Sequence, residues 1–145
     1  MGLDITEIMM DIEERFGINM LDDEPFDLTV QNIISNVTQK IRNISLQDRL
    51  HEVSNALERN ELQINRKIYN FYALKYGLMT ISFYQHTMLP NSFEEWSELI
   101  REKVLSTTAM SDSQISEEVK KIICARLRLS SVNDEDHLIR DLNAG

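Results

Sequence analysis

The stretch LDITEIMMDIEERFG, residues 3–17, decides how this chain folds. Its apolar side chains recur at spacings of three and four, which places them on one face of a helix: Ile5, Ile8, Met9, Ile12 and Phe16. Asp4 and Glu7 have the spacing of a capping box, so we expect the helix over residues 4–16, and we expect Gly17 to end it. The pattern predicts an amphipathic helix that must bury its apolar face against other parts of the chain.

Two further helix starts carry recognisable capping residues. Thr29 can cap a helix over residues 30–41, in which Val30, Ile33, Ile34, Val37 and Ile41 would face inward. Ser92 and Glu95 form a second candidate capping box, at the start of a helix whose buried face would hold Phe93, Trp96, Leu99, Ile100 and Val104.

The remaining segments complete an all-α prediction. A long polar helix with a narrow apolar stripe is expected over residues 46–76. A last clear helix is expected over residues 114–127, and it should pack against the two helices near the start of the chain through its inward residues Ile115, Val119, Ile122, Ile123 and Leu127. Residues 107–113 are small and polar and predict a linker, while residues 130–136 predict an ordered loop. Four Gly and two Pro in 145 residues leave few helix breakers, which favours helices over a turn-rich β fold.

Composition narrows the classes of function. Fifteen basic and twenty-four acidic side chains give a net charge of −9, which repels nucleic acid and anionic lipid and favours partner proteins with basic surfaces. The first residues lead directly into charged ones, without the apolar segment that a signal peptide has, so we expect no signal peptide. The apolar stretch at 78–84 is too short to cross a bilayer. We therefore expect a cytoplasmic protein.

Candidate chemical groups are few, and we expect neither catalysis nor a metal or cofactor. Cys124 lies among apolar neighbours and is interpreted as a small buried side chain rather than a reactive thiol. His51, His86 and His137 lack metal-ligand spacing. The acidic runs 22–24 and 134–136 are interpreted as solvated loops rather than cation sites. Aromatic side chains in the middle of the chain predict a core or, alternatively, a partner groove: Tyr69, Phe71, Tyr72, Tyr76, Phe83, Tyr84 and Trp96.

Both ends of the chain carry motifs of one known helical family. Residues 3–18, which end in Glu13-Glu14-Arg15-Phe16 before Gly17-Ile18, resemble the second helix of acyl carrier proteins, and Leu28-Thr29-Val30 resembles the start of the last helix of that family. Residues 115–123 resemble the first helix of the family, and residues 134–144 resemble the loop that follows it. The order of the two halves is circularly permuted, and the cut falls at the family's attachment site.

The resemblance implies a domain division. Residues 1–41 and 113–145 would together form a permuted carrier-like helical bundle, and residues 42–112 would form an inserted helical module. Homodimerisation is open, either through the middle helix or by exchange of the two halves between chains.

The resemblance also implies a missing group and a docking surface. In the family a serine carries phosphopantetheine, but Gly2 stands at the corresponding position here, and neither Ser130 nor Ser131 has the family's sequence context. The family's second helix docks on basic patches of partner enzymes. The matching carboxylates here form one stripe, which we call the acidic stripe: Asp4, Glu7, Asp11 and Glu14. If these carboxylates are exposed, reversing two of them should leave stability nearly unchanged.

Three functions are compatible with the sequence. The first is a non-acylated carrier-like adaptor in a fatty-acid or polyketide type of pathway. The second is an acidic interaction or inhibitor protein, such as a nucleic-acid mimic, that is unrelated to acyl transfer. The third is a true acyl carrier with an unrecognised attachment site.

Overall fold

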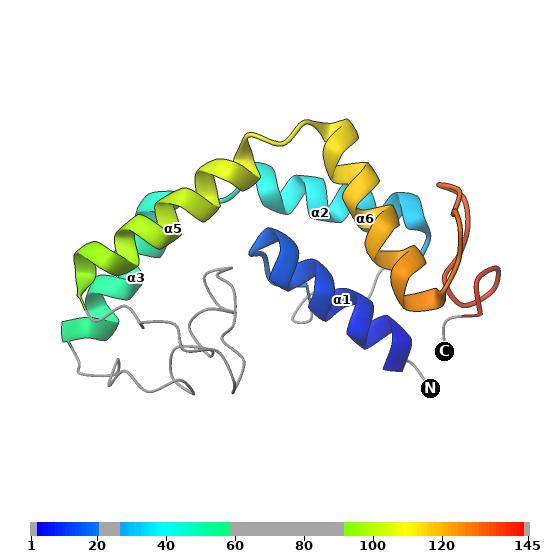
Figure 1. Cartoon of the computed structure of the whole chain (residues 1–145), viewed down its shortest axis with the longest axis horizontal. Helices are drawn as coiled ribbons and strands as arrows, with labels where there is room; N and C mark the ends of the chain where they lie inside the picture. Colours follow the sequence, from blue (N-terminus) through cyan, green and yellow to red (C-terminus); the bar gives the residue numbers. More distant parts are fainter. Residues whose placement is uncertain (1–2, 21–26, 59–91, 144–145) are drawn as a thin grey trace.

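The computed structural model of the protein describes residues 3–20, 27–58 and 92–143 (Figure 1). These residues form helices and no strand; one isolated antiparallel bridge joins Thr29 to His137. The all-α prediction is therefore confirmed for the described part of the chain. The helices are α1 (Leu3–Phe16), α2 (Val30–Arg42), α3 (Leu46–Glu58), α5 (Phe93–Thr108) and α6 (Asp112–Leu127).

Helix α1 differs from the prediction at its start and agrees with it at its end. It begins at Leu3, so Asp4 lies in the first turn and is not the capping residue. A carboxylate is still favourable there, because the first turn carries the positive end of the helix dipole. Gly17 ends the helix with a φ of 71°, and its N–H donates to the carbonyl of Glu13 at 2.8 Å. Glycine adopts this left-handed conformation without a steric penalty, which explains the stop.

Helix α2 begins as predicted, with the Thr29 hydroxyl accepting the Asn32 N–H at 3.1 Å. Two of its first backbone N–H groups are bound by the loop that follows α6 (residues 128–143, the C-terminal loop). Val30 donates to the carbonyl of Asp136 at 2.9 Å, and Gln31 donates to that of Asp134 at 2.8 Å. Helix starts leave such donors without partners inside the helix, so the C-terminal loop completes α2.

The linker prediction over residues 107–113 was wrong. Helix α5 continues to Thr108, and α6 begins at Asp112 after the N-cap residue Ser111. Ser111 and Gln114 form a reciprocal capping box: the Ser111 hydroxyl accepts the Gln114 N–H, and the Gln114 side chain accepts the Ser111 N–H. The small polar residues of this segment are helix ends and a cap, which leaves only residues 109–111 as the connection.

The middle of the chain is described in part. Helix α3 matches the first part of the helix expected over residues 46–76, and the rest of that prediction lies outside the described residues. Helix α5 starts after Ser92, whose hydroxyl accepts the Glu95 N–H at 3.2 Å, as the capping pattern predicts. Its predicted inward residues Trp96, Ile100 and Val104 are buried, whereas Leu99 is exposed.

The main core lies where α6 packs against both α1 and α2. This confirms the predicted packing of the helix near the end of the chain on the two helices near its start. Fully buried side chains from all three helices meet there: Ile8, Ile12, Phe16, Ile33, Val37, Ile115, Val119 and Ile123. Ile122 was also predicted to face inward, but it is only partly buried at the edge of this core.

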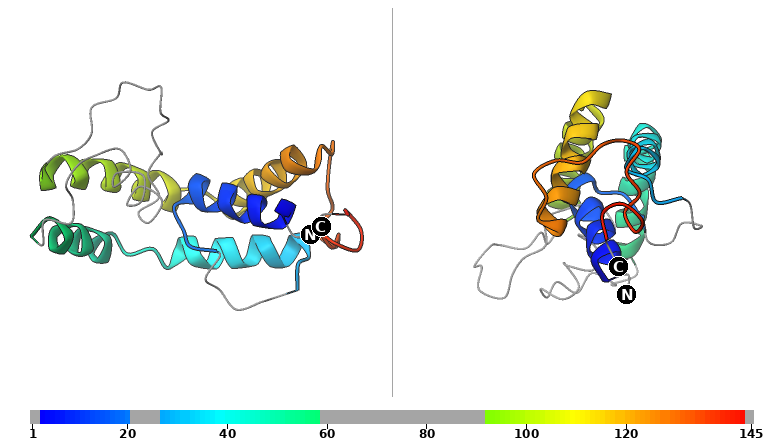
Figure 2. Two further views of the ribbon diagram at one scale, coloured as in Figure 1. Left: turned by 90° about the horizontal axis from the view of Figure 1, so that it is seen from below. Right: turned by 90° about the vertical axis from the view of Figure 1, so that its right-hand side faces the viewer.

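The described helices form an elongated molecule with two parts (Figures 1 and 2). The body consists of α1, α2, α6 and the C-terminal loop, and the arm consists of α3 and α5, which lie side by side. Helix α2 leads almost directly into α3, so the arm extends from one end of the body (Figure 2, left). The first turn of α1 and the C-terminal loop lie at the opposite end.

Arg42 joins the helices where the arm meets the body. Its guanidinium donates to the carbonyls of Thr108 at 3.1 Å and Met110 at 2.8 Å, and to the carboxylate of Asp112 at 2.7 Å. One side chain at the end of α2 therefore binds the end of α5, the connection and the start of α6.

Candidate functional site

The acidic stripe on α1 is partly paired with a cation on α6. The Arg126 guanidinium binds both carboxylate oxygens of Asp11, at 2.7 and 3.1 Å, and one oxygen of Glu7 at 3.1 Å. The condition attached to the double reversal, that all four carboxylates of the stripe are exposed, is therefore not met, since Asp4, Glu7 and Asp11 are only partly exposed. The reason is a contact between two helices, because α6 packs against α1 and places Arg126 beside the stripe.

This ion-pair cluster is electrostatically coupled. The pKa of Arg126 is raised above its usual value, first by its hydrogen bond to Asp11 and then by the negative charges of Asp11, Glu7 and Asp4. Reversing Glu7 and Asp11 to lysine would set three cations together, so this double reversal changes both the surface charge and the contact between α1 and α6. It is not the stability-neutral change that the sequence predicted.

Glu14 is the member of the stripe best placed for an outside partner. Its side chain is exposed, and no ion pair among the described residues includes it. The neighbouring Arg15 instead pairs with Glu118 of α6 at 3.3 Å. Asp4 is partly exposed at the other end of the stripe. The structure thus divides the stripe into a paired centre, Glu7 and Asp11, and two outer carboxylates.

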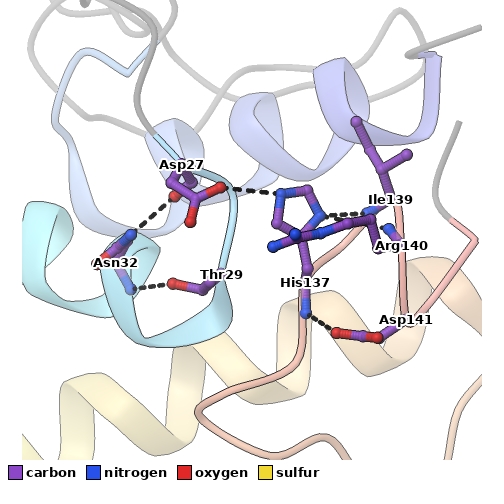
Figure 3. Close-up of polar contacts among 7 residues, drawn as sticks. All are labelled: Asp27, Thr29, Asn32, His137, Ile139, Arg140 and Asp141. Carbon is purple, nitrogen blue, oxygen red and sulfur yellow. Dashed lines mark hydrogen bonds and ion pairs between the residues drawn. The ribbon is translucent and has the colours of Figure 1, made fainter.

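A second polar cluster surrounds His137 and joins the C-terminal loop to the start of α2 (Figure 3). His137 is 9% exposed, and its Nε2 lies 3.1 Å from the carboxylate of Asp27. Its Nδ1 accepts the backbone N–H groups of Ile139 at 3.2 Å and Arg140 at 3.3 Å. Because Nδ1 accepts from two donors, it carries no proton in this arrangement, and Nε2 is the ring donor to Asp27.

The backbone of His137 adds to the same junction. Its N–H donates to the carboxylate of Asp141 at 2.8 Å, and the next N–H, of Leu138, donates to the carbonyl of Leu28 at 2.9 Å. In the sequence, His137 is an isolated histidine. Its partner Asp27 is 110 positions away, so no local spacing could identify the pair.

The acidic run 134–136 is held by protein groups. Asp134 forms an ion pair with Lys120 at 2.6 Å, and the Asp136 carboxylate accepts the Asn133 N–H at 2.9 Å. Within the described ranges, no group of three or more His, Cys, Asp or Glu side chains has the arrangement of a metal site.

The other candidate residues are dispersed. Ser130 and Ser131 are exposed in the C-terminal loop, His51 is exposed on α3, and Cys124 is half-buried in α6. Several predictions fall outside the described residues, namely those on Gly2, the acidic run 22–24, His86, and the aromatic group apart from Trp96.

None of the helices in the described segments has the length and apolar character needed to cross a bilayer. Comparison of the chain with family models, with curated proteins and with solved structures gives no match.

Proposed function

We propose that this chain is a non-acylated adaptor resembling an acyl carrier protein, which binds protein partners of a carrier-dependent pathway of the fatty-acid or polyketide type. The observation that carries the proposal is the assembly of the body. Segments near the two ends of the chain, α1 and α2 with α6 and the C-terminal loop, enclose one core. A permuted carrier-like bundle requires this joint core.

The position of the C-terminal loop also supports the proposal. In the permuted order, this loop should end near the start of α1, because the family's loop leads directly into its second helix. The loop and the first turn of α1 lie at the same end of the body (Figures 1 and 2). We infer that the protein lacks a prosthetic group because glycine, at position 2, has no hydroxyl to accept phosphopantetheine.

The proposed docking surface is the acidic stripe, with its two central carboxylates paired to Arg126. Glu14 and Asp4 would contact basic side chains of the partner directly. Glu7 and Asp11 would contribute less, because Arg126 already neutralises part of their charge. Exposed charges act mainly on the rate of association, so binding should weaken as salt rises. The adaptor would act in the cytoplasm as a protein-binding component without catalytic activity of its own.

The direct test is binding to a purified enzyme that accepts an acyl carrier protein. Glu14→Lys reverses an exposed charge of the stripe and should weaken binding about tenfold at low salt, through slower association. Glu117→Lys is the matched control, since Glu117 is an exposed glutamate on α6 outside the stripe, and it should bind like the unmodified protein.

Equal binding of both variants would show that the stripe is only a solvated face. Failure of the unmodified protein to bind any such enzyme would overturn the assignment to a carrier-dependent pathway.

A further inference from the structure

The Arg126 guanidinium of α6 lies across two carboxylates of α1. Its Nε and one terminal nitrogen donate to the two oxygens of Asp11 at 2.7 and 3.1 Å, and its other terminal nitrogen donates to Glu7 at 3.1 Å. Glu7 and Asp11 are four positions apart on one helix, so their side chains are neighbours on its surface. We call these two residues the carboxylate pair. A planar guanidinium suits the pair because its donors reach both carboxylates at once.

This contact lies at the surface of the molecule. The side chains of Arg126, Glu7 and Asp11 are 41%, 36% and 32% exposed. Ion pairs with this exposure contribute little to the free energy of unfolding. Beneath them, α1 and α6 are held together by apolar side chains that are fully buried, namely Ile8, Ile12, Val119 and Ile123. The guanidinium can therefore leave the carboxylate pair without separating the two helices.

The position of Arg126 in α6 also favours its release. Arg126 lies in the last turn of this helix, which ends at Leu127. A last turn carries the negative end of the helix dipole and carbonyl groups without partners inside the helix. A cation that leaves the carboxylate pair keeps a favourable environment there, so the exchange of one guanidinium for another has a low energetic cost.

The carboxylate pair is the centre of the proposed docking surface. A basic side chain of a partner that reaches the centre of the acidic stripe meets the same oxygens that Arg126 binds. Two guanidinium groups cannot bind these oxygens in the same plane, and two cations in contact repel each other. Arg126 and the partner therefore compete for the pair.

We propose that Arg126 is an intramolecular competitor at the docking surface, and that a partner docks fully by placing an arginine of its own between Glu7 and Asp11. The proposal rests on the proposed function for the role of the acidic stripe. An arginine is favoured over a lysine because only a guanidinium reproduces the two-oxygen contact with Asp11 together with the contact with Glu7. Arg126 would thus lower the affinity for basic surfaces in general and select partners that present an arginine.

The first test uses small probes and needs no carrier enzyme. The peptides acetyl-Arg-Arg-amide and acetyl-Lys-Lys-amide are titrated separately into the intact protein at low and matched ionic strength, and the side-chain carboxyl signals of Glu7 and Asp11 are followed by nuclear magnetic resonance. Arg126→Gln should bind the arginine peptide in the millimolar range, about tenfold more tightly than the unmodified protein does. The lysine peptide has the same charge, and Arg126→Gln should bind it about threefold more weakly than the arginine peptide.

The second test uses the same purified enzyme as the test of the proposed function. Arg126→Gln should bind this enzyme about tenfold more tightly than the unmodified protein does, because the carboxylate pair is then open to the partner. Arg126→Lys keeps the charge but not the planar donors, so its affinity should be intermediate. Arg128→Gln is the matched control, since it removes one positive charge from an exposed arginine just beyond α6, and it should change binding by no more than about twofold.

Equal binding of the arginine peptide by Arg126→Gln and by the unmodified protein would overturn the proposal, provided that amide spectra show both to be folded. Equal binding of the enzyme by these two proteins would overturn it too, and Arg126→Lys supplies the same comparisons if Arg126→Gln does not fold. Failure of the proposed function gives a different result. No form of the protein would then bind the enzyme, while the arginine peptide would still distinguish Arg126→Gln from the unmodified protein.

Discussion

Replacement of Arg42 by alanine should weaken the junction between arm and body by an amount that can be worked from its contacts. The side chain binds two carbonyls and one carboxylate, at 3.1, 2.8 and 2.7 Å. A hydrogen bond contributes a net of about 0.5–1.5 kcal/mol, and more when a charged partner is shielded from water, while an exposed ion pair contributes about 0.2–1 kcal/mol. The Arg42 side chain is 40% exposed, so the values without shielding apply.

These contacts together should contribute about 2 kcal/mol to the free energy of unfolding. For a chain of this size that loss lowers the melting temperature by roughly 6–8 °C, measurable by circular dichroism. Arg42→Lys keeps the charge but not the planar set of guanidinium donors, so it should lower the free energy of unfolding by about half as much as Arg42→Ala does. Arg101→Ala, at an exposed arginine of α5, should change the free energy of unfolding by no more than about 0.5 kcal/mol.

A melting temperature of Arg42→Ala equal to that of the unmodified protein would refute the reasoning. The junction would then depend on apolar packing, and the three hydrogen bonds would be exchanged for water without a net cost.

Three further results are expected. Ile123→Ala should lower the free energy of unfolding, measured by chemical denaturation, by about 2–5 kcal/mol, because Ile123 is fully buried. Ile122→Ala should lower it by less than half as much, and equal losses would contradict the observed orientation of α6. Incubation with coenzyme A and a broad-specificity phosphopantetheinyl transferase should leave the intact mass of the protein unchanged, while a standard acyl carrier protein in the same reaction is modified. A mass gain of one phosphopantetheine would refute the argument from Gly2. His137→Gln should speed hydrogen exchange at the amides of Ile139 and Arg140, because these amides lose their Nδ1 acceptor. His51→Gln, at an exposed site, should leave this exchange unchanged. Unchanged exchange in His137→Gln would show that the ring does not hold this loop.

Local signals in the sequence predicted most helix positions. Thr29 and Ser92 are identifiable as caps because a cap needs only a hydroxyl and an N–H three residues later, and both are visible in the sequence. The same signal is present at Ser111 and Gln114, but the small polar residues before it resemble a linker and hide it. Apolar spacing correctly placed Val119 and Ile123 in the core, and it was less exact for Ile122, which lies at the edge of the buried face.

The polar contacts between helices could not be predicted in this way. Arg126 reaches Asp11 across 115 positions, and the choice of that arginine over its neighbours depends on how α6 is rotated against α1. The pairing of His137 with Asp27 depends likewise on the path of the C-terminal loop. Such contacts follow from packing, and the spacing of charges along one helix does not contain them.

The packing of α6 against both α1 and α2 sets an order of events during synthesis. When α1 and α2 leave the ribosome, the helix that covers their apolar faces has not yet been made, because α6 begins at Asp112 whereas α1 ends at Phe16 and α2 ends at Arg42. Contacts between distant segments close late and slow the folding of a chain, and exposed apolar surface invites aggregation in the meantime. The nascent chain must therefore carry Ile8, Ile12 and Phe16 unprotected until α6 emerges. A truncated product that ends before residue 112 should be a ready substrate for chaperones and proteases.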